Sequence, residues 1–353
     1  MAVTSPIEGR KNDHIALCST ADVGFRARTT LLECVRLVHD ALPDLAVSEL
    51  DTRVTVFGKT LRAPILIAAM TGGSEEAGRI NRQLAQIANE RGYAFGLGSQ
   101  RAMLKRPEAK DTYDVRKVAP DVCLLGNLGI VQAAQLTTLQ VKELAESVGA
   151  DALCIHLNPA MELIQKDGDR DFKNGLETLR RLSAELPLPV IVKETGCGLS
   201  RGVGVRLRSI GIRHADVSGA GGTSWVGVET HRAKSAGHGA GAILGDAFWD
   251  WGIPTAASVV QLAPLGFDTI FATGGVGSGL DAARAIALGA SVAGIARPVL
   301  RALHEGGVEG ATRFLDDVES SLRAAMLLTG SRTIADLRAA PRMITGELRD
   351  WVG

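Results

Sequence analysis

The sequence lacks the features that would place it among nucleic-acid-binding, secreted or membrane-spanning proteins. Among its 353 residues, 39 Lys and Arg balance 39 Asp and Glu, so it has no basic excess for neutralising nucleic-acid phosphates. The N-terminal residues 1–14 contain no apolar signal segment, and the longest apolar run, residues 63–70, is far too short to span a bilayer. We therefore expect a cytoplasmic protein without a nucleic-acid or membrane partner.

Metal-binding and disulfide patterns are also missing. The five cysteines are an odd number and contain no CxxC pair, so neither zinc nor an iron–sulfur cluster has supporting spacing. We expect thiols that remain reduced and unpaired. They are Cys18, Cys34, Cys123, Cys154 and Cys197.

Glycine, in contrast, is abundant, with 41 residues that separate short apolar runs from amphipathic stretches. Continuous apolar runs without alternation are typical of strands buried on both faces. Eight such runs occur, at residues 65–70, 93–98, 122–127, 152–158, 190–194, 214–218, 269–273 and 291–296. Helical periodicity lies between several of them, at residues 80–91, 137–147, 174–186, 255–265 and 280–288.

Eight strands that alternate with helices predict an α/β protein with one (β/α)8 TIM barrel. A doubly wound sheet is the alternative, but no GxGxxG motif follows the first strand. We expect an N-terminal extension over 1–62, the barrel over 63–305 and a helical cap over 306–353. The extension carries a hairpin with its turn at Gly58-Lys59, which we expect at the barrel bottom. The glycine-rich residues 219–252 predict a long loop that acts as a lid or binding loop.

Polar residues gather where the predicted strands end. Active sites of such barrels lie at these carboxyl ends, and a purely structural barrel has no need of polar groups there. The glycines after strands seven and eight, at 274–275 and 294, favour a phosphate site, although they could serve only tight turns. Lys193 ends strand five, either as a rim lysine or as a positive charge beside an anionic cofactor.

Several motifs, in order along nearly the whole chain, resemble the type 2 isopentenyl-diphosphate isomerase family, whose members are FMN-dependent (β/α)8 barrels. The SGAGGT motif alone would not be specific, because glutamate synthase barrels are similar there. The motifs are RKNDH (10–14), APILIAAMTGG (63–73), GLGSQR (96–101), GNLG (126–129), HLNP (156–159) with Glu162, VKE (192–194), SGAGGTSW (218–225), GIP (252–254), MLLTGS (326–331) and ITGELR (344–349).

The resemblance implies a flavin lying across the top of the barrel. Its ring would contact Ala69, Met70, Thr71, Ser99, Asn127 and Lys193, and its ribityl and phosphate side would face Ser218 and Thr223. The FMN phosphate would lie in the turns formed by Gly274, Gly275, Ala296 and Arg297. Arg297 stands where the family tends to be uncharged, so it either reinforces this phosphate site or is simply exposed.

For the substrate, the resemblance implies a prenyl diphosphate and a 1,3-proton shift that converts isopentenyl to dimethylallyl diphosphate on reduced FMN. NADPH would be the reductant, Glu162 and the diphosphate would hold Mg²⁺, and the protein would be a homo-tetramer or homo-octamer. Lys193 and His156 would be catalytic, and Trp225 would flank the isoprenoid end. The diphosphate would meet Arg10, Lys11, His14, Arg101, His156 and Asn158.

One departure from the family concerns the reacting carbons. Met161 precedes Glu162 where the family usually has Gln, and a thioether cannot donate a hydrogen bond. Four interpretations stay open: isomerisation that depends on the flavin alone, a different prenyl diphosphate or reaction, a deliberate replacement of the residue, or a non-catalytic flavin and prenyl-diphosphate binder. An α-hydroxy-acid oxidase is disfavoured, because SGAGGTSW lacks the His and Arg that such enzymes place after strand six.

The basic N-terminal residues lie far from any strand end. Arg10, Lys11 and His14 can therefore reach the site only if their segment folds over the pocket, from the same chain or from a neighbouring subunit.

Overall fold

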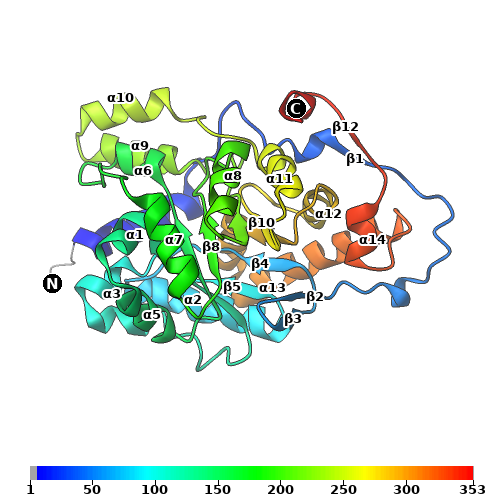
Figure 1. Cartoon of the computed structure of the whole chain (residues 1–353), viewed down its shortest axis with the longest axis horizontal. Coiled ribbons are helices and arrows are strands. Elements are labelled where there is room, and N and C mark those ends of the chain that lie inside the picture. Colours follow the sequence, from blue (N-terminus) through cyan, green and yellow to red (C-terminus); the bar gives the residue numbers. More distant parts are fainter. Residues whose placement is uncertain (1–5, 353) are drawn as a thin grey trace.

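The barrel is closed by eight short parallel strands in the computed structural model, which describes residues 6–352 (Figure 1). Each strand pairs with its sequence neighbours, and the last pairs with the first, which confirms the predicted (β/α)8 fold. The runs predicted from continuous hydrophobicity all supply a strand. They are β4 (Ile65–Ile67), β5 (Ala94–Gly96), β6 (Cys123–Gly129), β7 (Ala152–His156), β8 (Val190–Lys193), β9 (His214–Asp216), β10 (Thr269–Ala272) and β11 (Val292–Ile295).

Helices surround the barrel, and several begin at a side chain that accepts a hydrogen bond from the first turn. Ser74, for example, accepts from the Ala77 N–H at the start of α2, and Ser278 accepts from the Asp281 N–H at the start of α12. The surrounding helices are α2 (Glu75–Arg91), α3 (Arg101–Lys105), α4 (Ile130–Gln135), α5 (Thr138–Glu146), α6 (Pro159–Ile164), α7 (Gly175–Glu185), α8 (Arg201–Ser209), α9 (Trp225–Ser235), α10 (Gly239–Ala247), α11 (Thr255–Leu262), α12 (Gly279–Ala287) and α13 (Arg297–Leu327).

The prediction of a long loop over 219–252 is wrong, because this segment contains α9 and α10, which pack on each other (Figure 1). Several of its glycines serve close packing. A Cβ at Gly245 would collide with Thr230, and one at Gly227 would collide with the indole of Trp249. Ser224 caps α9 by accepting from the Gly227 N–H. Glycine content therefore indicated close helix contact here and not an irregular chain.

The hairpin closes the interior of the barrel. Strands β2 (Val54–Val56) and β3 (Lys59–Leu61) are joined by Phe57 and Gly58, both with positive φ, so the turn lies one residue earlier than predicted. Val56 and Leu61 belong to the same buried cluster as Leu66, Leu125 and other inward-facing strand residues. The Phe57 ring stacks on Phe271 with 6.1 Å between centroids. The hairpin thus plugs the end opposite the strand carboxyl termini.

The remaining elements flank the barrel. Helix α13 breaks at Gly307, where φ of 63° and ψ of −160° are not helical, so the last barrel helix ends close to the expected 305/306 boundary and a second helical segment follows it. None of the helices in residues 6–352 is long and apolar enough to cross a membrane. The other elements are α1 (Pro6–Thr20), a two-stranded sheet of β1 (Val35–Leu37) and β12 (Arg342–Ile344), α14 (Ile334–Ala339) and α15 (Leu348–Trp351), with 3-10 turns η1 (Leu32–Cys34), η2 (Val47–Glu49), η3 (Pro107–Thr112) and η4 (Ala263–Leu265).

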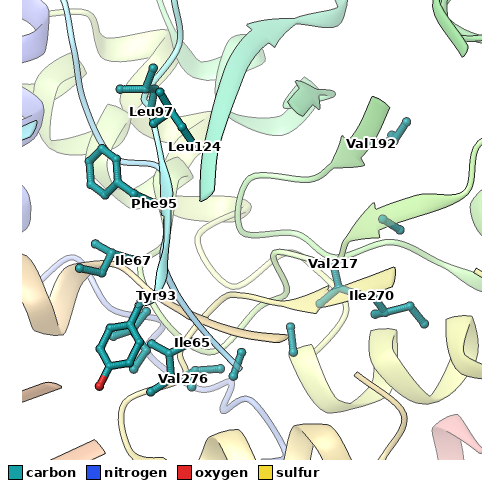
Figure 2. Close-up of a cluster of buried hydrophobic side chains, with 14 of the residues drawn as sticks. Ile65, Ile67, Tyr93, Phe95, Leu97, Leu124, Val192, Val217, Ile270 and Val276 are labelled. Atoms are coloured by element: carbon teal, nitrogen blue, oxygen red, sulfur yellow. The ribbon is translucent and has the colours of Figure 1, made fainter. Parts of the chain in front are cut away.

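The main core lies between the strands and the helices, and one buried polar contact joins it to α13. Figure 2 shows Tyr93 beside Ile65 and Val276, with its hydroxyl at the edge of this cluster. That hydroxyl donates to Glu319 Oε2 at 2.6 Å, and Arg62 donates to Glu319 Oε1 at 3.0 Å. Glu319 is only 6% exposed, so these two donors take the place of the water that would solvate an exposed carboxylate.

We expect Tyr93→Phe to lower the free energy of unfolding by about 1–2 kcal/mol, because Glu319 would keep Arg62 but lose a buried donor. Urea unfolding followed by circular dichroism measures the change. Arg53→Ala is the control, since it removes only the exposed Arg53–Asp51 pair and should leave the free energy of unfolding nearly unchanged. Equal effects of the two substitutions would contradict a special role for the Glu319 network.

Candidate active site

A cavity of about 530 Å³ opens at the carboxyl ends of the strands. All of the site residues predicted from the sequence line this one cavity. Those from strand ends and their following loops are Ala69, Met70, Thr71, Ser99, Asn127, His156, Asn158, Lys193, Ser218, Thr223, Gly274, Gly275 and Ala296. Those from helices are Arg10, Lys11 and His14 on α1, Arg101 on α3, Met161 and Glu162 on α6, Trp225 on α9 and Arg297 on α13.

Helix α1 covers the cavity from the same chain, so no neighbouring subunit is needed to supply the basic residues. Arg10 donates to Gln165 Oε1 at 2.7 Å, and His14 Nε2 lies 2.6 Å from Glu229 Oε1. The His14 ring meets Trp225 edge to face at 5.3 Å between centroids. Neither Glu229 nor Gln165 was predicted, because each lies far along the sequence from the residue it holds.

Arg10, Lys11 and Arg101 lie close together at one end of the cavity. Because they are partly buried, their positive charges repel one another. Burial and the charges of Arg10 and Arg101 lower the pKa of Lys11 to about 8. Burial also lowers the pKa of Arg10, and the charge of Glu229 opposes that effect. Lys11 is therefore still mostly protonated at neutral pH. An anion bound among these three side chains would relieve their repulsion.

A carboxylate pair lies beside the cations. Glu162 on α6 is 9% exposed, and its Oε2 accepts from the Asp169 N–H at 2.8 Å. Burial and the nearby charge of Asp169 raise the pKa of Glu162. Asp169 itself accepts from Gln132 at 2.8 Å and from Arg101 at 3.3 Å. Asp169 thereby orients two groups that line the cavity.

His156 is held as a neutral imidazole. Its Nδ1 lies 2.7 Å from Asn127 Oδ1, and the Asn127 amide donates in turn to the Leu97 carbonyl at 3.0 Å. Because this bond fixes the Asn127 oxygen as an acceptor, His156 Nδ1 carries the proton and Nε2 keeps its lone pair. Burial, followed by the charges of Lys193, Lys11 and Arg101, lowers the pKa of His156 to about 3.

Lys193 has a buried counter-ion that the sequence did not reveal. Its Nζ lies 3.1 Å from Asp216 Oδ2 and donates to the Glu194 carbonyl at 2.8 Å. Asp216 ends the next strand and also accepts from the Thr273 hydroxyl at 2.6 Å. The rim-lysine alternative is wrong, since Lys193 is only 8% exposed. Adjacent parallel strands bring Lys193 and Asp216 into register, and that pairing was the signal available in the sequence.

Met161 lies among these groups without supplying a proton donor. It is 8% exposed, and its Sδ accepts from the Asn158 amide at 3.3 Å. Asn158 adopts a left-handed conformation with φ of 52° at the start of α6, where it turns the chain from β7 into the helix. The departure from the family pattern therefore lies directly on the cavity.

The other end of the cavity is built from backbone. Gly274 and Gly275 have φ of 97° and 73°, and a Cβ on either would collide with the 219–221 backbone. Helix α13 begins next to this turn, so its N-terminus faces the cavity. Nearby, the buried Thr71 hydroxyl has no hydrogen-bond partner among residues 6–352.

The guanidinium of Arg297 is directed to α1. It donates from Nε to the Cys18 carbonyl at 3.1 Å and from Nη2 to the Ala21 carbonyl at 2.6 Å. Its side chain is half-buried, so the expectation that it is simply exposed is wrong.

Comparison with known proteins identifies the family of this chain. The model of the FMN-dependent dehydrogenase family matches residues 5–183 and 137–344. An isopentenyl-diphosphate delta-isomerase of Thermococcus kodakarensis is 44% identical over 351 residues, covering 97% of this chain and 93% of the relative. The chain belongs to the isopentenyl-diphosphate delta-isomerase family. The resemblance inferred from the sequence motifs is thereby confirmed.

Other members of the isomerase family are similarly close. The isopentenyl-diphosphate delta-isomerase of Methanothermobacter thermautotrophicus is 41% identical over 348 residues, with 98% of this chain and 96% of that protein covered. Among solved structures, a mandelate oxidase mutant bound to a trifluorodihydroxypropanoic acid aligns with a TM-score of 0.66 at 18% identity, covering 95% of this chain and 94% of that chain. This likeness concerns the fold alone.

We expect His156 to remain neutral, with its proton on Nδ1, throughout pH 5–8 in the ligand-free protein. The pKa of about 3 places protonation well below this range, and Asn127 selects the tautomer. Nitrogen-15 NMR of labelled histidine measures both properties. Asn127→Ala should leave the ring neutral but mix the tautomers. Protonation of His156 near pH 6 in the wild type would contradict the assignment.

Proposed function

We propose that this protein converts isopentenyl diphosphate to dimethylallyl diphosphate and that it binds FMN and Mg²⁺ for this reaction. One observation carries the proposal: a single cavity joins a cluster of cations with a buried carboxylate to a backbone turn at a helix N-terminus. The first region suits a diphosphate and the second suits a cofactor phosphate. Membership of the isomerase family supports the same substrate.

The residues present fit FMN. The glycine turn at 274–275 and the start of α13 form a cradle of backbone that side chains would block. The unpartnered Thr71 hydroxyl offers a hydrogen bond to a polar ring edge, and Lys193 supplies a buried positive charge on the cavity wall. Bound and reduced, for which we propose NADPH, FMN would supply an electron-rich ring able to exchange a proton with the substrate. Lys193, held by Asp216, would stabilise negative charge beside it.

A magnesium ion fits only together with substrate. Residues 6–352 contain no group of three or more His, Cys, Asp or Glu side chains that could hold a metal. Of the two buried glutamates near the cations, Glu162 lines the cavity, whereas Glu229 is paired with His14 and Arg232. Mg²⁺ is commonly held by one or two carboxylates plus phosphate oxygens. We therefore propose that Glu162 and the diphosphate share the ion, and that Arg10, Lys11 and Arg101 neutralise the remaining charge.

The chain's other groups would orient the substrate. His156 Nε2, with its lone pair, can donate to a phosphate oxygen only after it takes up a proton, and a bound dianion favours that uptake. Trp225 offers an apolar surface for the isoprenoid end beside His14. Helix α1 covers the cavity and limits the access of water to the reacting carbons.

We expect anaerobic protein, supplied with FMN, Mg²⁺ and dithionite, to produce dimethylallyl diphosphate from isopentenyl diphosphate, as followed by proton NMR. Omitting the reductant or adding EDTA should abolish product, and Glu162→Gln should raise the Mg²⁺ concentration needed for half-maximal rate at least tenfold. A colourless protein that does not take up FMN would reject the cofactor. Yellow protein without product would reject the isomerase reaction and direct attention to other prenyl diphosphates.

Met161 supports a second candidate, a flavoprotein of this family that acts on another prenyl diphosphate or only binds it. A thioether on the cavity wall can neither donate nor relay a proton, and it suits a larger apolar group.

We expect Met161→Gln to raise kcat for isopentenyl diphosphate about tenfold with little change in KM, because the amide can donate a hydrogen bond beside the reacting carbons and one such bond made only in the transition state is worth about 1 kcal/mol or more. Met161→Leu is the matched control, since it keeps an apolar side chain of similar volume and should leave kcat unchanged. Steady-state kinetics under reducing conditions distinguish the two. Equal rates for the Gln and Leu variants would show that the residue at 161 takes no part in proton transfer.

A further inference from the structure

Helix α1 carries substrate-facing side chains but belongs to no barrel unit. Its attachments therefore decide where Arg10, Lys11 and His14 lie. Three of them use its own side chains: Arg10 with Gln165 at 2.7 Å, His14 with Glu229 at 2.6 Å and Asp13 with Arg232 at 3.1 Å. Two of these three employ Arg10 and His14, the groups proposed for the diphosphate. Such contacts compete with the ligand and cannot hold the helix unchanged when a ligand binds.

The attachment through Arg297 is different in kind, because it uses the backbone of α1. Arg297 is the first residue of α13, and its two bonds reach Cys18, in the last turn of α1, and Ala21, just beyond it. Carbonyls at a helix C-terminus lack partners within the helix and carry partial negative charge. A guanidinium with two donors suits them, and Arg301 adds a longer bond of 3.3 Å to Ala21.

We propose that Arg297 is a positioning residue for substrate binding: it anchors the C-terminal end of α1 to the barrel and thereby holds Arg10 and Lys11 over the cavity. The anchor leaves the cavity-facing side chains of α1 free for a ligand. Arg297 is also the first residue of α13, whose N-terminus faces the glycine turn at 274–275. The same residue therefore connects the end of the cavity that α1 covers with the end that the glycine turn forms. The diphosphate as ligand rests on the proposed function, but the anchoring itself does not.

The test uses FMN-loaded full-length protein and compares Arg297→Ala with the wild type. We expect the Kd for inorganic diphosphate with Mg²⁺, measured by calorimetry, to rise about tenfold. KM for isopentenyl diphosphate should rise similarly, with a smaller change in kcat. Trypsin should cleave after Arg10 and Lys11 several times faster, while absorbance near 450 nm shows that FMN is retained. Arg297→Lys, which keeps a cation near the carbonyls, should recover part of the diphosphate affinity.

Arg313→Ala is the matched control, because Arg313 is exposed on the same helix and should change none of these properties. If Arg297→Ala fails to fold, Arg297→Gln keeps the length and a neutral donor and serves the same comparison. Unchanged diphosphate affinity and unchanged cleavage would overturn the proposal. Loss of FMN with unchanged diphosphate binding would also overturn it and make Arg297 a cofactor residue. Absence of isomerase activity in the wild type would reject the proposed function, while calorimetry and proteolysis would still test the anchor.

Discussion

Repulsion among the cationic side chains at one end of the cavity is the constraint on which the rest of the site depends. Arg10, Lys11 and Arg101 are brought together before any anion is bound, and the lowered pKa of Lys11 is the consequence. The fold tolerates this arrangement because acceptors surround it. Gln165 and Asp169 each accept from one of these cations, and Glu162 lies close enough to offset their charge. The Nε of Arg10 has no partner among residues 6–352, and a bound anion would supply the acceptors that this polar network still lacks.

The contacts that stabilise the barrel lie at its bottom, whereas the polar pairs that line the cavity lie at its top. At the bottom, the hairpin fills the interior and Glu319 joins Arg62 and Tyr93 across three segments. At the top, Lys193 with Asp216 and His156 with Asn127 are fixed by neighbouring strands. Neighbouring parallel strands bring these pairs together, because their carboxyl ends lie side by side. The loops that follow the strands can then vary in sequence without disturbing the hairpin end.

Continuous apolar runs predicted the eight strands because burial on both faces leaves a plain local signal. The glycine-rich segment misled, since local composition does not show whether glycine permits a loop or a close contact, as between Gly245 and Thr230. Motifs located the cavity wall, but they could not show the partners of its residues. Glu229 and the carbonyls bound by Arg297 are more than two hundred residues from their partners, and only the folded chain brings them together.

Because α1 folds back over the barrel of its own polypeptide, each chain builds a whole cavity from its own residues. In an assembly of several copies, damage to one subunit would then silence one cavity and leave the others intact. Two different inactive variants mixed within the same assembly would not restore each other, as they can when a site is divided between subunits. The activity of the assembly would fall in proportion to the fraction of damaged chains, because an inactive copy would leave its neighbours unaffected.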